Sequence, residues 1–202
     1  MGQIREPENV CLICAITFKK VDELEKAIDF LTEKYGNIML KSPVYNFDHT
    51  NYYQQEMGSG LEKVFLAFNK LIHPKDLPEI KLYTNEIEQQ FLTDGKRQIN
   101  LDPGYVEAPK LVLATTKNYE HRIYLDKNIY GDVQLRLRKD GIQTNPWTYP
   151  DYKEKIVLEF FEKVKSLYMK KLRTRQDTDQ NQNSGKTCNT VSKLITRTRV
   201  SI

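Results

Sequence analysis

Continuous apolar runs mark the strands that we expect at the centre of a sheet. Residues 10–16 and 64–68 are apolar at every position, which is typical of strands covered on both faces. Residues 51–57 and 97–102 instead alternate or are mostly polar, as strands at the edge of a sheet tolerate. The pattern therefore predicts two central strands and two edge strands.

Two helices are predicted between these strands. Apolar residues recur every three or four positions over residues 21–35, and Gly36 follows where a helix can end. Residues 77–91 show the same spacing, with Pro78 in the first turn. The resulting order, β-α-β-β-α-β, has its apolar strands first and third. It predicts an α+β fold with a ferredoxin-like sheet, in which the first and third strands are the inner two.

The second half of the chain predicts a β-hairpin that extends this sheet. Residues 121–125 and 129–138 alternate, and a three-residue loop at 126–128 would join them. This register places Arg122 directly opposite Asp132, where the two side chains can form a cross-strand ion pair.

A C-terminal helix is predicted over residues 151–172, where it would cover the face that a ferredoxin-like sheet leaves open. Its apolar stripe consists of Ile156, Phe160, Val164 and Leu167. We therefore expect residues 1–172 to form a single α+β domain.

The net charge of +4 belongs to the end of the chain. Residues 173–202 hold six Lys or Arg against two Asp and no aromatic residue, so the preceding residues are formally neutral. This composition predicts a disordered polar, basic tail. A neutral core makes nucleic acid an unlikely partner, because nucleic-acid binding relies on a concentrated basic surface.

Nothing in the hydropathy pattern predicts a membrane protein. No stretch approaches the roughly 20 apolar residues of a membrane span, and the first residues do not follow the secretory pattern. We expect a cytoplasmic location. Cys11 and Cys14 form a C-x-x-C sequence within a predicted strand, which places them on opposite faces as core residues rather than as a redox pair.

Dense polar and aromatic segments contain the candidate chemistry. They read RQINLDPGY, ATTKN, HRIYL and PWTYPDY between residues 97 and 152, with TNYYQQEMG upstream. Such residues cost free energy to bury unless they find partners. Over residues 10–172, these segments resemble a bacterial family known as domain of unknown function 4416. Its members often carry a GTP-binding label, but the resemblance implies no reaction and no cofactor.

The sequence itself gives no support to GTP binding. Gly185-Lys186-Thr187 imitates the end of a phosphate-binding loop, but Gln180 stands where that motif requires glycine. Hydroxyl, amide and basic groups in the dense segments are nevertheless suited to phosphate or carboxylate. The predicted ligand-binding residues are Arg97, Asn100, Gly104, Tyr105, Thr115, Thr116, Lys117, Arg122 and Tyr124.

Residues 101–105 predict a turn, because Pro103 fixes φ and glycine at 104 permits positive φ. Backbone amides exposed in that turn could hold an anion. Alternatively, the Asp102 carboxylate only caps the turn. Both roles can hold together.

His121 is the predicted general acid or base, with Glu56 or Asp102 orienting it. A structural role for this histidine is the alternative, since it falls on the apolar-facing side of its strand. Asp48, His49 and Glu56 have no diagnostic spacing, so we predict no metal site.

Three classes of function remain open. The first is a binding module for a nucleotide or another phosphorylated anion, and the second is a hydrolytic or phosphoryl-transfer enzyme that uses His121. The third is a structural or partner-binding protein. Either of the first two predicts that one pocket gathers Glu56, Asp102, Lys117, His121 and Arg122. The sequence does not indicate a cofactor or an oligomeric state.

Overall fold

The computed structural model describes the backbone of residues 2–48 and 54–195, and the side chains of residues 2–48 and 56–175. Within these residues the chain is mixed α+β, with nine strands in one sheet whose pairings are all antiparallel. The elements are β1 (Val10–Phe18), α1 (Val21–Tyr35), β2 (Ile38–Lys41), β3 (Tyr45–Phe47), α2 (Gln54–Met57), β4 (Leu61–Ile72), the 3-10 turn η1 (Pro74–Asp76), α3 (Leu77–Gln90), β5 (Ile99–Val106), β6 (Lys110–Thr115), β7 (Arg122–Asp126), β8 (Ile129–Arg138), β9 (Gly141–Thr144), the 3-10 turn η2 (Pro150–Lys153) and α4 (Lys155–Ile195).

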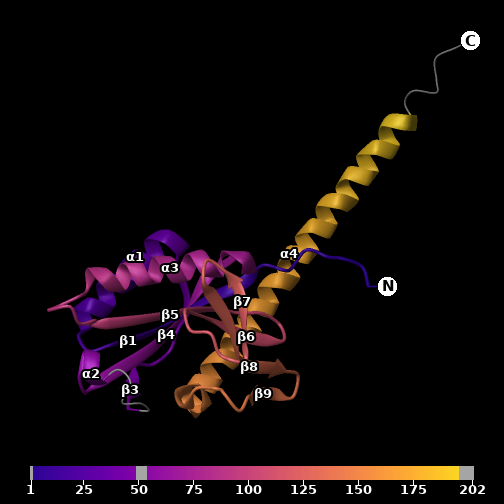
Figure 1. The fold of residues 1–202 in the computed structure, drawn as a ribbon. Helices are drawn as coiled ribbons and strands as arrows, with labels where there is room; N and C mark the ends of the chain where they lie inside the picture. The colour runs from indigo at the N-terminus through magenta and orange to yellow at the C-terminus, as the bar shows by residue number, and fades with distance from the viewer. Residues whose placement is uncertain (1, 49–53, 196–202) are drawn as a thin grey trace, which may run out of the picture. The chain divides into compact units, whose positions relative to one another are not determined.

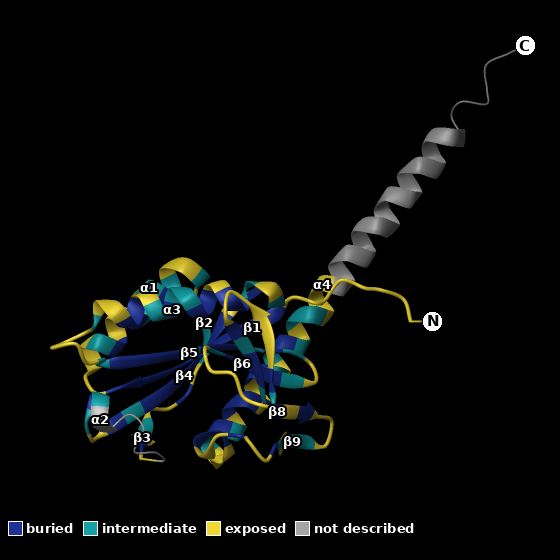
Figure 2. Ribbon diagram, in the orientation of Figure 1, coloured by how far each residue is buried: buried dark blue, intermediate teal, exposed yellow. Residues whose placement is uncertain are grey.

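The apolar runs form the centre of the sheet, as predicted. The strand order is β2-β4-β1-β5-β6-β8-β7, with β3 added beside β4 and β9 beside β8. Every residue of β1 is buried, and Figure 2 shows β1 and β4 as buried strands. Helices α1 and α3 lie over one face of these strands (Figure 1), where their apolar residues join Leu12, Ile16 and Leu66 in one core cluster. Cys11 and Cys14 are buried in β1, as expected of core residues.

The prediction of a strand over residues 51–57 is wrong for the part that the structure describes. Residues 54–57 form the short helix α2 instead, and residues 51–53 lie outside the described chain, as does His49. The strands between α1 and β4 are β2 and β3. No residue of β2 is fully buried, so its sequence lacks the alternation that marks a strand with one buried face. Their shortness and their position at the sheet's edge left too little periodicity to detect.

The turn that the sequence predicted at residues 101–105 is not formed, although residues 99–102 have no strand partner on the side away from β1 in the described chain. Strand β5 continues from Ile99 to Val106 and pairs with β1 along its whole length. Pro103 therefore lies inside a strand, opposite Cys14. Gly104 is not among the glycines with positive φ in the described chain. The expected anion-binding turn is thus absent from residues 101–105 as the structure describes them.

The predicted hairpin is correct in register and differs only at its tip. Arg122 lies opposite Asp132, and Tyr124 lies opposite Tyr130. The loop has two residues, Lys127 and Asn128, both with positive φ, and a bulge before Asp126 absorbs the remaining residue. Positive φ at both loop residues matches the twist of the two strands.

The second face of the sheet is covered by η2 and the first turns of α4. Phe65 on β4 contacts Tyr152, Phe160 and Phe161, with ring centroids 5.2–5.8 Å apart. The helix begins at Lys155 rather than at residue 151, because residues 150–153 form a 3-10 turn. Of the predicted stripe, Phe160 and Val164 are buried, whereas Ile156 and Leu167 are only partly so.

The chain divides into two compact units, residues 1–165 and 166–202. The first holds the whole sheet. In the second, the backbone of α4 is helical up to Ile195, so the predicted disorder beyond residue 172 stays a prediction. Among the described residues, no helix is both long and apolar enough to cross a membrane.

Candidate functional site

Strands β5 and β6 separate part-way along their length and leave a cleft. Their pairing joins Val106 to Leu111 and ends at Gly104 and Leu113 in the described chain. A Cβ atom on Gly104 would lie only 2.4 Å from the carbonyl oxygen of Val112. The glycine is therefore needed for the close approach of the two strands at the point where they last meet.

Two side chains of α3 form hydrogen bonds with the edge of β5 that faces the cleft. Glu88 accepts a hydrogen bond from the backbone N–H of Leu101 at 2.6 Å, and Lys81 donates one to the carbonyl oxygen of Leu101 at 2.9 Å. In an antiparallel ladder the N–H and C=O of one residue point to the same side. These side chains thus take the place of a neighbouring strand, and no buried backbone group of Leu101 is left without a partner.

The cleft has a volume of about 910 Å³, which is the size of a small-molecule site. Register places Asp102, Leu113, Asp132 and Arg122 on the same face of the sheet, away from α1. The polar and charged lining residues are Glu56, Lys63, Lys81, Asn85, Glu88, Gln89, Arg97, Asn100, Asp102, Thr115, Thr116, Lys117, Arg122, Asp132 and Asp151, with Tyr119, Tyr149 and Tyr152 among the aromatic ones.

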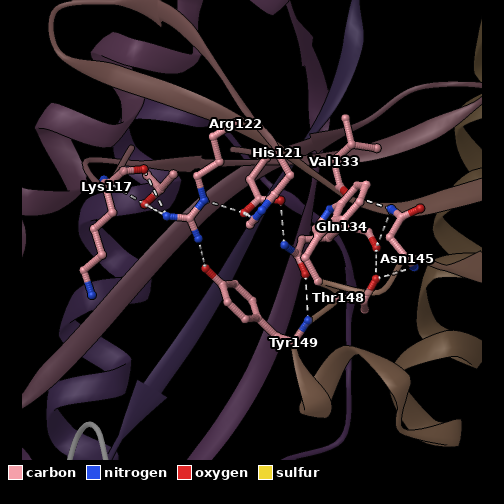
Figure 3. Close-up of polar contacts among 11 residues, drawn as sticks. Lys117, His121, Arg122, Val133, Gln134, Asn145, Thr148 and Tyr149 are labelled. Atoms are coloured by element: carbon pink, nitrogen blue, oxygen red, sulfur yellow. Dashed lines mark hydrogen bonds and ion pairs between the residues drawn. The ribbon is translucent and has the colours of Figure 1, made fainter. Parts of the chain in front are cut away.

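Arg122 is held rigidly by the strand and loop around it (Figure 3). Its Nε donates to Asp132 Oδ2 at 2.8 Å, and both side chains are almost fully buried. Its Nη1 and Nη2 donate to the carbonyl oxygen of Lys117 at 3.0 Å and to the hydroxyl of Tyr149 at 2.7 Å. Asp132 in turn accepts from Gln134 at 2.7 Å. Such a network fixes the guanidinium plane before any ligand arrives.

His121 lies behind this network and is not among the described residues that line the cleft. Its ring stacks on Trp147 and Tyr119, with centroids 5.0 and 6.2 Å away. Its Nε2 lies 3.4 Å from Asp132 Oδ2. His121 contacts two residues that line the cleft, Asp132 and Tyr119, without lining it itself, so its geometry favours a supporting role over direct proton transfer.

Arg97 gathers the acidic groups on the opposite side of the cleft. Its Nε and Nη2 donate to the two carboxylate oxygens of Glu56, both at 2.7 Å. Its Nη1 donates to Asn100 at 3.0 Å and to Glu88 at 3.2 Å. Asn100 then donates to Asp102 at 2.7 Å. This bidentate pair occupies both oxygens of Glu56, which leaves the residue poorly placed to accept a proton from a ligand.

Lys63 and Asp151 form a second buried ion pair. The Lys63 ammonium donates to Asp151 Oδ2 at 2.6 Å, and the two side chains are 6% and 5% exposed. The rings of Phe47 and Tyr152 surround the ammonium at 4.7 and 5.3 Å. Asp151 therefore does not cap α4, because its carboxylate is committed to Lys63.

The carboxyl groups of the cleft differ in how easily they hold a proton. Hydrogen bonds from Arg97 hold the pKa of Glu56 below its ordinary value. Burial raises the pKa of Glu88 despite the nearby Lys81. Burial would also raise the pKa of Asp102, but Lys81 and Lys63 outweigh it and the net shift is downward. Glu88 is thus the one of these three that holds its proton to higher pH.

The two walls of the cleft carry opposite net charges. We call the residues of β6, β7, β8 and the loop between β6 and β7 the hairpin wall, and those of the remaining elements the helix wall. Of the described residues that line the cleft, the hairpin wall contributes two cations and one carboxylate: Lys117, Arg122 and Asp132. The helix wall contributes three cations and four carboxylates: Lys63, Lys81, Arg97, Glu56, Glu88, Asp102 and Asp151. A ligand with one anionic end matches this asymmetry.

The structure brings most of the predicted site residues into this one cleft. Those that line it are Glu56, Arg97, Asn100, Asp102, Thr115, Thr116, Lys117 and Arg122. Tyr105 packs against the core beneath α3, and burial raises its pKa to about 12. Tyr124 is 54% exposed beside Tyr130. Gly104 serves strand packing. These three, with His121, are not among the described lining residues.

Sequence reasoning missed several lining residues that come from regular elements. Lys63 lies on the same face of β4 as Leu61 and Phe65, and a lysine in this apolar row was a usable signal. Lys81 and Glu88 lie seven residues apart on α3, which places them on the same side of the helix. Nothing in the periodicity indicated that both would turn toward β5.

No group of three or more His, Cys, Asp or Glu side chains suited to a metal ion occurs among the described residues. Asp48 and Glu56 were considered with His49, which lies outside the described chain.

The fold and the cleft define an α+β domain in which polar residues from distant segments converge on one site. The family model described as Domain of unknown function (DUF4416) matches residues 8–168. The chain belongs to this family. Comparisons with curated proteins and with solved structures give no match.

Proposed function

We propose that this protein binds a phosphorylated small molecule in the cleft between β5 and β6. In this proposal the phosphate lies against the hairpin wall, where Thr115, Thr116 and Lys117 surround Arg122. The nucleotide or sugar part extends toward the helix wall.

One observation carries the proposal: the excess of cations and hydroxyl groups on the hairpin wall. Arg122 and Lys117 face the cleft with one carboxylate, that of Asp132, among the described lining residues of this wall. The Arg122 guanidinium is oriented by Asp132 and Tyr149. Asp132, Lys117 and Tyr149 already accept from the three nitrogens of this guanidinium, so Arg122 would attract phosphate mainly through its charge, and Lys117 would supply the direct contact.

Aromatic residues support a ligand with an organic part. Tyr119, Tyr149 and Tyr152 line the cleft together with Phe47 and Leu113. A volume of about 910 Å³ also exceeds what a phosphate ion alone requires.

A substitution at Lys117 tests the proposal. Phosphate, sugar phosphates and nucleotides are titrated by calorimetry, and melting temperatures are measured with each compound in excess. A ligand at 100 times its Kd adds about 2.7 kcal/mol of stability. Lys117→Ala should weaken binding about tenfold, because one charge-assisted contact is lost.

Lys139→Ala is the matched control. Lys139 is exposed and is not among the described lining residues, and its loss changes the net charge equally. If no compound binds, or if both variants weaken binding alike, phosphate recognition at the hairpin wall is wrong.

A ferredoxin-like unit is our proposal for the first half of the sheet. The spatial order β2-β4-β1-β5, with every neighbour antiparallel and a helix after β1 and after β4, supports this topology. An experimental structure of residues 1–172 tests it.

A further inference from the structure

Unsatisfied hydroxyl groups gather around Lys63. Four buried side-chain nitrogen or oxygen atoms make no hydrogen bond among the described residues, and three of them are Thr17 Oγ1, Tyr45 OH and Tyr152 OH. Buried polar groups usually have partners, since a missing hydrogen bond costs roughly 1–3 kcal/mol. Three such hydroxyls on residues that neighbour Lys63 therefore require an explanation.

Strand register places these groups side by side. Tyr45 on β3 lies opposite Lys63 on β4, Lys63 lies opposite Thr17 on β1, and Thr17 lies opposite Asn100 on β5. Opposite residues in an antiparallel pair point to the same face of the sheet. The row thus runs across four strands, and Tyr152 covers it with its ring 5.3 Å from the Lys63 ammonium.

The row opens onto the cleft at its Lys63 and Asn100 positions. Lys63, Asn100, Asp151 and Tyr152 all line the cleft. A group that enters from the cleft therefore meets an ammonium, a carboxylate and a phenol together. Lys63 makes one hydrogen bond, to Asp151, among the described residues, although an ammonium has three donors.

The chemistry of this cluster selects a neutral group with hydroxyls. Lys63 and Asp151 cancel in charge, and the surrounding helix wall carries one carboxylate more than cations among its described lining residues. A second anion would be repelled there. A sugar hydroxyl instead donates to a carboxylate and accepts from an ammonium or a phenol at the same time.

We propose that Lys63, Asp151 and Tyr152 form a subsite for the sugar hydroxyls of the ligand. This inference rests on the proposed function, because it assigns the second end of the same ligand. The phosphate lies at the hairpin wall and the sugar at the row on the helix wall. Burial and the nearby Asp151 raise the pKa of Tyr152, so its phenol stays protonated as a donor.

Tyr152→Phe tests the subsite, because it removes one hydroxyl and keeps the ring. Affinities for ribose 5-phosphate, 2-deoxyribose 5-phosphate and inorganic phosphate are measured by calorimetry on the full chain. The variant should bind ribose 5-phosphate about fivefold more weakly, as expected for one hydrogen bond, and inorganic phosphate equally well. Its ligand-free melting temperature should be unchanged or higher, since an unsatisfied hydroxyl is removed.

Two further variants make the test decisive. Thr17→Val removes a buried hydroxyl that is not among the described lining residues, with little change in shape, and should leave the affinity ratio unchanged. Tyr130→Phe is the control, because Tyr130 lies on β8 and is not among the described residues lining the cleft.

Different failures separate the two proposals. If ribose 5-phosphate and inorganic phosphate bind wild-type protein equally, or if Tyr152→Phe leaves their ratio unchanged, the sugar subsite is wrong and phosphate binding stands. If Tyr152→Phe leaves the ratio of the two affinities unchanged and also lowers the ligand-free melting temperature, the Tyr152 hydroxyl has a partner within the protein. The sugar subsite is then wrong as well. If none of the three compounds binds, the proposed function and the subsite both fall.

Discussion

The two walls of the cleft are built over different distances along the chain. On the hairpin wall, Arg122 and its partner Asp132 are 10 residues apart on neighbouring strands. On the helix wall, Arg97 and Glu56 are 41 residues apart, and Lys63 and Asp151 are 88 apart. The sequence predicted the first pair and none of the others. Strand register determines a local pair, whereas distant pairs depend on how whole elements pack.

The Arg122–Asp132 pair of the hairpin wall and the Arg97–Glu56 pair of the helix wall also differ in exposure. The Arg122 and Asp132 side chains are 3% and 1% exposed, whereas those of Arg97 and Glu56 are 22% and 34% exposed. Water screens a partly exposed pair, so breaking it costs little. A charge left alone in the interior is far more costly. The Arg122–Asp132 pair should therefore be less tolerant of mutation than the Arg97–Glu56 pair.

The largest expected effect comes from removing Asp132. Asp132→Ala leaves Arg122 buried without its carboxylate and should lower the free energy of unfolding by about 3–5 kcal/mol. Glu56→Ala is the matched comparison. It leaves Arg97 in contact with Glu88 and Asn100 and should cost about 1 kcal/mol or less. Urea denaturation of both variants measures the difference.

Similar losses from these two variants would contradict the contrast between these two pairs. A large loss from Glu56→Ala alone would reverse it and make the Arg97 network the main support of the cleft.

A smaller effect, dependent on pH, is expected at Glu88. Its pKa in the folded protein lies above the ordinary value of 4.5. The folded state then holds this proton to higher pH than the unfolded chain does, so stability falls as pH rises from about 4.5 to the folded pKa. Glu88→Gln should remove this fall, whose slope is at most about 1.4 kcal/mol per pH unit.

The difference in unfolding free energy between wild type and Glu88→Gln isolates this group. Glu56 and Asp102 have lowered pKa values, so their contributions are lost as pH falls below their ordinary values and are present in both proteins. Our interpretation of Glu88 fails if the difference is constant above pH 4.5 or grows in favour of wild type.

The smallest effect is expected from removing the end of the chain. Every described residue that lines the cleft lies before residue 153 in the chain. Truncation after Leu172 should therefore leave the melting temperature within about one degree and ligand affinity unchanged, because a polar segment buries little apolar surface. A marked drop in differential scanning calorimetry would show that residues 173–202 stabilise the domain.

Much of the fold was predictable where periodicity was strong. The helix over residues 21–35 and the strand that begins at Val10 were found because their apolar positions repeat without interruption. The sequence failed at β5, where Pro103 and Gly104 suggested a turn. Local turn propensity was overruled there by pairing with β1 on one side and by close contact with β6 on the other.

The site was predictable from composition but not in its details. Asn100, Thr115 and Lys117 belong to the dense polar segments, and all of them line the cleft. Lys81 and Asp132 were not site candidates, because on a helix or a strand such residues usually face water. Their positions depend on the separation of β5 from β6, which no local pattern in the sequence encodes.

The pairing of α3 with the edge of β5 also has a consequence for folding. If the pairing of β5 with β6 continued in register beyond Gly104 and Leu113, Asp102 would lie opposite Thr115 and the two strands would close the cleft. Lys81 and Glu88 occupy the donor and acceptor of Leu101 that such closure would use. The same two contacts keep this edge from recruiting a strand from another molecule, so they protect against aggregation while they hold the cleft open.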